Sequence, residues 1–251
     1  MTDISQETVP EQPREPTWEE DESSTTLALR AASTLLVGAL LAWAQYVAPA
    51  SWSTSGIGAN WNSWIELSVV ANFLIPLFVV WMFFGQGLSH LDWLKDQRHN
   101  AWNYGWNFAG WHKHLLKAFI VVAVMLPFVY HFSRDPDVRQ YYQDFYFPPL
   151  DTPRAMLYLL GTLTIYMFCW EWFFRGFLLF GMAQGFGIVP ACLLQAVLFG
   201  LCHLGKATPE TVGAFIGGGL LGIWAWRERS FLPAFFTHAL LHIAWAILIY
   251  H

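Results

Sequence analysis

The sequence has few charged residues. Only 12% of its 251 residues are Asp, Glu, Lys or Arg, and 55% are hydrophobic, whereas an ordinary soluble domain carries about twice that charged fraction. No long polar stretch separates the apolar runs that recur from residue 31 to the end of the chain. This shortage of charge argues against a soluble fold and predicts one membrane domain.

Two further patterns are missing. The N-terminus is acidic and lacks the basic-then-apolar order of a cleavable signal peptide, so we expect the first apolar segment to be retained. The three cysteines, at positions 169, 192 and 202, match no metal-binding or redox spacing and all fall in apolar segments. We therefore expect the three cysteines to be small buried side chains that fill space between helices, and they indicate no cellular compartment.

Residues 1–26 form a compositionally distinct tail. They hold eight acidic residues, one basic residue, three prolines and no apolar periodicity, which predicts a disordered segment. Without them the chain carries two more basic than acidic residues, so the acidic net charge belongs to the tail. We expect a membrane domain over residues 27–251.

The remaining chain contains seven apolar segments of near-spanning length. A helix needs about 20 mainly apolar residues to cross the hydrocarbon core. The pattern predicts an all-α, polytopic membrane bundle of about seven transmembrane helices. The segments lie near residues 31–50, 64–85, 114–132, 154–181, 186–204, 209–226 and 231–250. The sixth is the least hydrophobic, and its glycines at 217–219 and 222 predict tight contact with a neighbouring helix.

Basic residues beside these segments predict the orientation. With the N-terminus in the cytoplasm, eight Lys or Arg residues flank the inner side and four the outer side. The excess of basic residues on cytoplasmic loops favours this arrangement. An odd number of spans then places residue 251 outside.

Ionisable side chains within the apolar segments are the candidates for function. Each is unfavourable in hydrocarbon by about 2.5–3.5 kcal/mol on insertion scales and needs a partner or a role. Glu171 and Arg175 are four residues apart in the fourth segment, so they share a helix face and can pair. Taken alone, this spacing indicates a structural ion pair.

Histidines in the fifth and seventh segments change that interpretation. His238 and His242 are four residues apart and present two imidazoles on one helix face, and His203 ends the fifth segment. This spacing suits a divalent metal such as Zn²⁺, with His203, His238 and Glu171 as the expected ligands. Three histidines and a buried carboxylate in neighbouring apolar helices favour a functional site over isolated core residues.

Three motifs in chain order resemble those of the CPBP family, the CAAX-type and bacteriocin-processing intramembrane proteases also called Abi proteins. The resemblance covers about residues 154–245 and rests on residues 174–176, on Phe199 to His203, and on Pro233 with His238. It departs from the family at two positions. Trp170 stands where the family has the first Glu of its EExxxRG motif, and His242 stands where the last motif has Asn or Asp.

The resemblance implies an intramembrane endopeptidase that acts on a membrane-associated protein or peptide within the lipid bilayer. Glu171 would accept the proton of water, while His203 and His238 would bind that water or a metal. Arg175 and His242 would orient these groups. Glu210, just after His203, is a second acid that could replace the missing carboxylate, although an acid in a first helical turn also has a purely structural explanation.

Two other functions stay open. Trp170 favours a non-catalytic relative, a membrane scaffold or immunity-type protein. A transporter with a proton or metal relay is a further alternative, but no inverted repeat relates the two halves of the chain. We expect no nucleic-acid partner, and the sequence does not choose among prenylated CAAX tails, leader peptides and sorting anchors as substrates.

Overall fold

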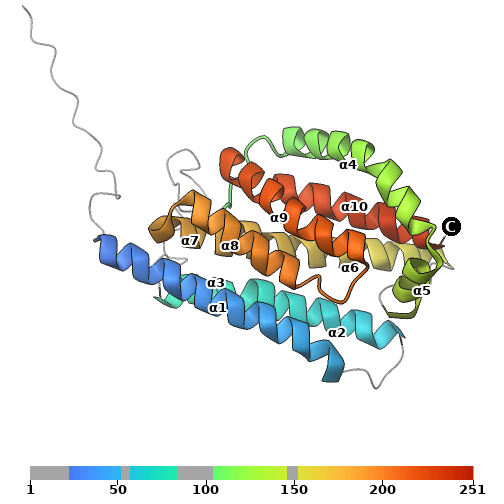
Figure 1. Ribbon diagram of the computed structural model, residues 1–251, viewed down its shortest axis with the longest axis horizontal. Coiled ribbons are helices and arrows are strands. Elements are labelled where there is room, and N and C mark those ends of the chain that lie inside the picture. The colour runs from blue at the N-terminus through green and yellow to red at the C-terminus, as the bar shows by residue number, and fades with distance from the viewer. Residues whose placement is uncertain (1–22, 52–56, 84–103, 146–151, 251) are drawn as a thin grey trace, which may run out of the picture.

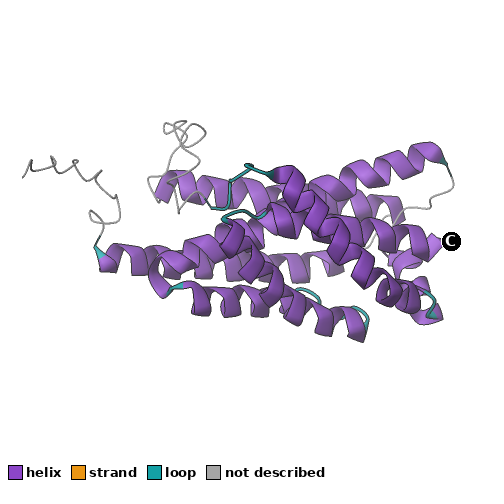
Figure 2. Ribbon diagram, turned by 90° about the horizontal axis from the view of Figure 1, so that it is seen from above, coloured by secondary structure: helices purple, strands orange, loops and turns teal. Residues whose placement is uncertain are grey.

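The chain folds as a helical bundle in this computed structural model, which describes residues 23–51, 57–83, 104–145 and 152–250 (Figures 1 and 2). All regular structure in these ranges is helical, so the predicted all-α class is confirmed. Two π-helical segments, η2 and η4, interrupt longer helical runs. The elements are α1 (Ser24–Ser51), α2 (Ile57–Val69), η2 (Val70–Leu74), α3 (Ile75–Phe83), α4 (Trp111–Ser133), α5 (Pro136–Phe145), α6 (Pro153–Glu171), η4 (Trp172–Leu178), α7 (Leu179–Phe186), α8 (Ile188–Leu201), α9 (Thr208–Glu228) and α10 (Leu232–Tyr250).

Each predicted apolar segment lies on a helix or on a continuous helical run, but the number of spans is not confirmed as seven. Five described helices or runs are long and apolar enough to cross a membrane: Ser24–Gln45, Trp61–Met82, Trp111–Ser133, Pro153–Phe186 and Leu232–Tyr250. Helix α8 is apolar but has only 14 residues. Helix α9, the predicted sixth segment, is not among the five.

Helix α10 lies within the bundle and carries two of the predicted site residues. It packs against α4, α6 and α9, while α8 pairs with α9 and α1 packs along α7. Figure 1 shows α4 along one edge of the bundle and α1 with α2 and α3 along the opposite edge. The helices that carry the conspicuous ionisable residues are therefore enclosed between these two outer layers.

The outer surface is apolar. Only 6% of the α4 spanning window is buried, and its large side chains Leu116, Ile120, Val124 and Phe128 are all exposed. Contiguous apolar exposure on this scale is unfavourable in water and suits contact with lipid. The chain is therefore an integral, multi-pass membrane protein.

Close backbone approaches hold neighbouring helices together. A Cβ at Gly185 would lie 2.4 Å from the Leu27 carbonyl oxygen, so α1 and α7 touch through the glycine. At the α8–α9 contact, a Cβ at Gly222 would lie 2.6 Å from Gln195, whereas Gly217 and Gly219 face no neighbour within 4 Å. The glycine run thus provides close packing on one of its faces, as small residues do between membrane helices.

Most of the predicted acidic tail lies outside the described residues. Of residues 1–26 only 23–26 are described, and residues 24–26 form the start of α1.

Candidate active site

Glu171 and Arg175 lie where the long α6–η4–α7 run changes from α-helical to π-helical. Helix α6 ends at Glu171, the π segment η4 contains Arg175, and both side chains are 0% exposed. Arg175 Nη1 donates to Glu171 Oε1 at 3.0 Å and lies 2.9 Å from Oε2. A π turn adds one residue to the helical hydrogen-bonded ring and occurs frequently at functional sites. The ion pair predicted from the spacing is therefore present and fully buried.

His238 joins this pair from α10. Its Nδ1 lies 2.5 Å from Glu171 Oε1. A carboxylate can only accept, so Nδ1 carries the proton in this hydrogen bond and a neutral His238 keeps its lone pair on Nε2. Glu171 thus receives hydrogen bonds from Arg175 in its own helical run and from His238 in another helix.

His203 follows α8 in the turn that leads to α9. It is 4% exposed, and its Nδ1 lies 2.8 Å from the Phe199 carbonyl oxygen. Because a carbonyl also only accepts, Nδ1 donates here too and Nε2 keeps the lone pair. Thr211 Oγ1 donates to the His203 carbonyl oxygen at 2.7 Å, which fixes this turn against the first part of α9.

The Phe199 ring is the common neighbour of these groups. The Arg175 guanidinium carbon lies 4.0 Å from its centroid, in a cation–π contact. The rings of His203 and His238 have their centroids 4.7 Å and 5.8 Å from it. Phe199 therefore brings residues from η4, α10 and the turn after α8 to one place inside the bundle.

His242 lies one turn beyond His238 on α10, with the two ring centroids 5.3 Å apart. Glu210 belongs to a different group. Lys206 Nζ donates to Glu210 Oε1 at 2.8 Å, and the Tyr142 hydroxyl from α5 donates to Oε2. The proposed substitute carboxylate is thus held by its own partners, as the structural explanation of this acid requires.

Trp170 lies directly beside the site. It is 4% exposed, and its ring centroid is 5.0 Å from that of Phe174, 6.1 Å from that of Phe199 and 6.2 Å from that of His203. At the position where the resemblance expects a carboxylate, the protein has an aromatic wall with one N–H donor.

The predicted metal ligands His203, His238 and Glu171 are near neighbours of the Phe199 ring or of one another. In the described ranges no group of three or more His, Cys, Asp or Glu side chains could hold a metal ion. Glu171 is already engaged by Arg175 and His238, whereas His203 and His238 both keep the Nε2 lone pair. A metal held by His203, His238 and Glu171 stays a prediction.

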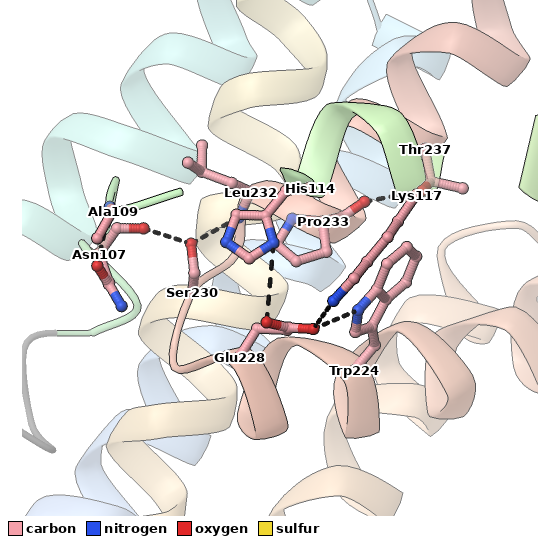
Figure 3. Close-up of polar contacts among 10 residues, drawn as sticks. All are labelled: Asn107, Ala109, His114, Lys117, Trp224, Glu228, Ser230, Leu232, Pro233 and Thr237. Carbon is pink, nitrogen blue, oxygen red and sulfur yellow. Dashed lines mark hydrogen bonds and ion pairs between the residues drawn. The ribbon is translucent and has the colours of Figure 1, made fainter. Parts of the chain in front are cut away.

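A second polar group fixes the N-terminal end of α10 (Figure 3). Ser230 Oγ donates to the Asn107 carbonyl oxygen at 2.6 Å and accepts from the Leu232 N–H at 3.2 Å. Close by, Lys117 of α4 pairs with Glu228 of α9 at 2.5 Å, and His114 lies 3.9 Å from the same carboxylate. Sequence reasoning missed this group, because its members come from three separate segments.

The hydrogen bond from Lys117 lowers the pKa of the Glu228 carboxyl below its ordinary value of 4.5, against the opposing effect of burial. Glu228 lies past the predicted sixth span and is 29% exposed. These contacts tie α4 and α9 together where α10 begins, six residues before His238.

Comparison with known proteins identifies the region that contains the site. Residues 152–244 match the model of a family described as type II CAAX prenyl endopeptidase Rce1-like. No curated protein and no solved structure matches the chain significantly. The matched region contains Glu171, Arg175, His203, His238 and His242, and the resemblance to the CPBP and CAAX proteases is confirmed over this part of the chain.

Proposed function

We propose, from the premise that residues 152–244 form an Rce1-like domain of a CAAX-type protease family, that this protein is an intramembrane endopeptidase. The observation that carries the proposal is the 2.5 Å contact between Glu171 Oε1 and His238 Nδ1 inside an apolar bundle. A carboxylate bound to one imidazole nitrogen orients the ring and stabilises its protonated form, which is the arrangement that a general base needs.

His238 acts as the base in this mechanism. Its Nε2 lone pair accepts a proton from water as the water oxygen attacks the carbonyl carbon of the substrate. The carbonyl electron pair moves to oxygen, and it returns when the C–N bond breaks. His238 then gives its proton to the leaving amine nitrogen. From the sequence we expected Glu171 to be the base, but its contacts with Arg175 and His238 favour an orienting role instead.

Arg175 and His203 support this reaction. Arg175 keeps Glu171 ionised and fixed, because its guanidinium is bonded to the carboxylate and stacked on Phe199. His203 offers a second Nε2 lone pair near the same ring and helps to hold the attacking water. His242, one turn from His238, lines the site on the side toward the C-terminal end of α10. No step in this scheme requires a metal.

The substrate is a membrane-associated peptide. The family description names prenylated CAAX sequences, so a short peptide with a prenylated cysteine is the first substrate class to test.

The orientation of the chain in the membrane follows from the basic residues beside the helices, which favour a cytoplasmic N-terminus.

Kinetics on a defined peptide test the proposal. The purified protein in lipid nanodiscs receives a fluorogenic prenylated peptide, and the wild type is compared with His238→Asn and with Tyr158→Phe, a matched control whose hydroxyl bonds Asn62 away from the site. We expect His238→Asn to lower kcat by at least about 10²-fold, within the usual range for general-base catalysis. EDTA should leave the wild-type rate unchanged. An active His238→Asn protein would contradict the assignment of His238 as the base. Loss of activity in EDTA would indicate that the reaction requires a metal ion.

A non-catalytic scaffold is the second candidate, and Trp170 is the observation that favours it. The same assay decides between the two, because a scaffold cleaves nothing in any variant.

A further inference from the structure

Trp170 buries a hydrogen-bond donor beside the proposed catalytic histidines. Its side chain is 4% exposed, and Nε1 has no hydrogen-bond partner among the residues that the structure describes. Buried polar groups without partners are uncommon in folded proteins and mark functional positions or positions where another molecule binds. The indole ring packs against Phe174, Phe199 and His203, so Trp170 is a neighbour of the proposed site.

Apart from the imidazoles, most of the buried side-chain atoms at the site that have no hydrogen-bond partner among the described residues are donors. The unpartnered buried donors are Trp170 Nε1 and Arg175 Nε and Nη2. The acceptor in the same state is Glu171 Oε2, whose charge already faces Arg175 at 2.9 Å. His203 and His238 contribute lone pairs at Nε2, which suit water as a donor but cannot stabilise negative charge. A substrate oxygen that gains charge would therefore depend on the unpartnered N–H groups.

We propose that the Trp170 indole N–H binds the carbonyl oxygen of the scissile peptide bond and stabilises the negative charge that forms on it. This inference rests on the proposed peptidase function. When water attacks, the C=O electron pair moves to that oxygen while His238 takes the proton from water. The pair returns to carbon as the C–N bond breaks and His238 protonates the nitrogen. A donor placed before the reaction lowers the barrier because it does not have to reorganise.

Trp170 is a better candidate for this role than Arg175. The Arg175 guanidinium is bonded to Glu171 and lies 4.0 Å from the Phe199 ring centroid, so its plane is fixed by two contacts. A neutral donor also leaves the Glu171–Arg175 ion pair intact when the oxygen becomes charged. Arg175 therefore serves to keep Glu171 in place for His238.

Two other tryptophans show what distinguishes Trp170. Trp172 and Trp245 also bury an indole N–H that has no hydrogen-bond partner in the described part of the chain. The Trp172 ring packs on Phe73 and Trp106, and the Trp245 ring packs on Tyr142. Of these three indoles, Trp170 is the one whose ring contacts His203.

The proposal also explains how the site works without the first glutamate of the motif. A carboxylate at position 170 would accept a proton, whereas an indole can only donate a hydrogen bond. Trp in place of Glu therefore turns a hydrogen-bond acceptor at position 170 into a donor. The base must come from elsewhere, and His238 already occupies a base geometry through Glu171.

Three variants in nanodiscs test the assignment with the fluorogenic peptide. Trp170→Phe removes the N–H and keeps an aromatic ring, Trp170→His keeps a ring donor, and Trp172→Phe makes the same deletion away from the site. We expect Trp170→Phe to lower kcat by about 10²–10³-fold, the range for loss of one oxyanion donor. KM should change by less than about threefold. A loss of binding that affects substrate and transition state equally would instead raise KM and leave kcat unchanged. Trp170→His should recover at least about tenfold of the loss, and Trp172→Phe should stay within about twofold of the wild type.

A peptide phosphonate, which mimics the charged intermediate, provides a second measurement. Its affinity should weaken in Trp170→Phe by the same factor as kcat/KM. A Trp170→Phe protein with wild-type kcat, or an equal loss in Trp172→Phe, would overturn the assignment while the peptidase function stood. Absence of cleavage by the wild type would overturn both.

Discussion

At the scale of single residues, the buried Glu171–Arg175 ion pair should strongly affect the stability of the molecule. Both side chains are 0% exposed, and two charges removed from solvent lose hydration that their attraction must offset. His238 adds a hydrogen bond to the same carboxylate, which strengthens the acceptor side of the pair. Such a pair is sensitive to the loss of one partner and tolerant of the loss of both.

Glu171→Gln should therefore be more harmful to stability than a double change. The single variant leaves the Arg175 charge buried and uncompensated, which lowers the free energy of unfolding by about 3–5 kcal/mol. In Glu171→Gln/Arg175→Met we expect most of that stability to return, because an apolar side chain replaces the unpaired cation. Thermal unfolding in nanodiscs measures both.

Activity separates this structural effect from the chemical one. The double variant should remain inactive although it is stable, because His238 has lost its ionised partner. A stable and fully active double variant would show that the Glu171 carboxylate is not needed for the reaction.

At the scale of helices, the Lys117–Glu228 contact ties α4 to α9 and should make this joint sensitive to acid. The pKa of Glu228 is lowered in the folded protein, so between this value and 4.5 the unfolded chain binds more protons than the folded one. The stabilisation is present above pH 4.5 and disappears as the pH falls through the lowered pKa. For a pair this exposed we expect no more than about 1 kcal/mol.

Unfolding of the wild type and Glu228→Gln from pH 7 to pH 3 measures this contribution. The difference in free energy of unfolding should be largest at neutral pH and vanish at the acidic end. Lys117→Met serves as the matched control, since Glu228→Gln in that background should have little further effect. A difference that grows as the pH falls would contradict the sign of the linkage.

The sequence predicted the helical class and the Glu171–Arg175 contact, but not the other contacts of these residues. Apolar runs and rare buried ionisable groups are visible one residue at a time, so the helical class and the pairing of Glu171 with Arg175 could be predicted. The π segment η4 and the hydrogen-bond partners of each imidazole depend on tertiary contacts such as the Phe199 carbonyl. The hydrogen-bond partners of His203 and His238 therefore could not be predicted from spacing, and the Ser230 and Glu228 contacts could not be predicted either.

At the scale of the whole molecule, the number of crossings decides on which side each end lies. Five described helices or runs meet the length and hydropathy of a span, and α8 and α9 together form an additional pair. With five or seven crossings, residue 251 lies on the side of the membrane opposite the N-terminus. If α9 crossed the membrane and α8 did not, both ends would lie on the same side. The count does not say which end is inside, and the prediction of a cytoplasmic N-terminus rests on the basic residues alone.

Reporter fusions test the orientation. A reporter that is active only outside the cytoplasm should be silent when fused after residue 30 and active after residue 251. Fusion after residue 230 should be silent, because the turn between α9 and α10 is predicted to lie inside. Activity after residue 230 together with silence after residue 251 would overturn this map.

The central claim is that the Glu171–His238 pair hydrolyses a peptide bond within the membrane. The most direct measurement uses cells that express the wild type, His238→Asn or Trp172→Phe at equal levels. Cleavage takes place in H₂¹⁸O, so that each peptide bond hydrolysed leaves an ¹⁸O-labelled carboxylate, and the membrane peptides of the cells are compared by mass spectrometry. The account predicts a defined set of labelled termini in the wild type and in Trp172→Phe that is absent in His238→Asn. The same labelled termini in all three strains, at equal abundance, would contradict it.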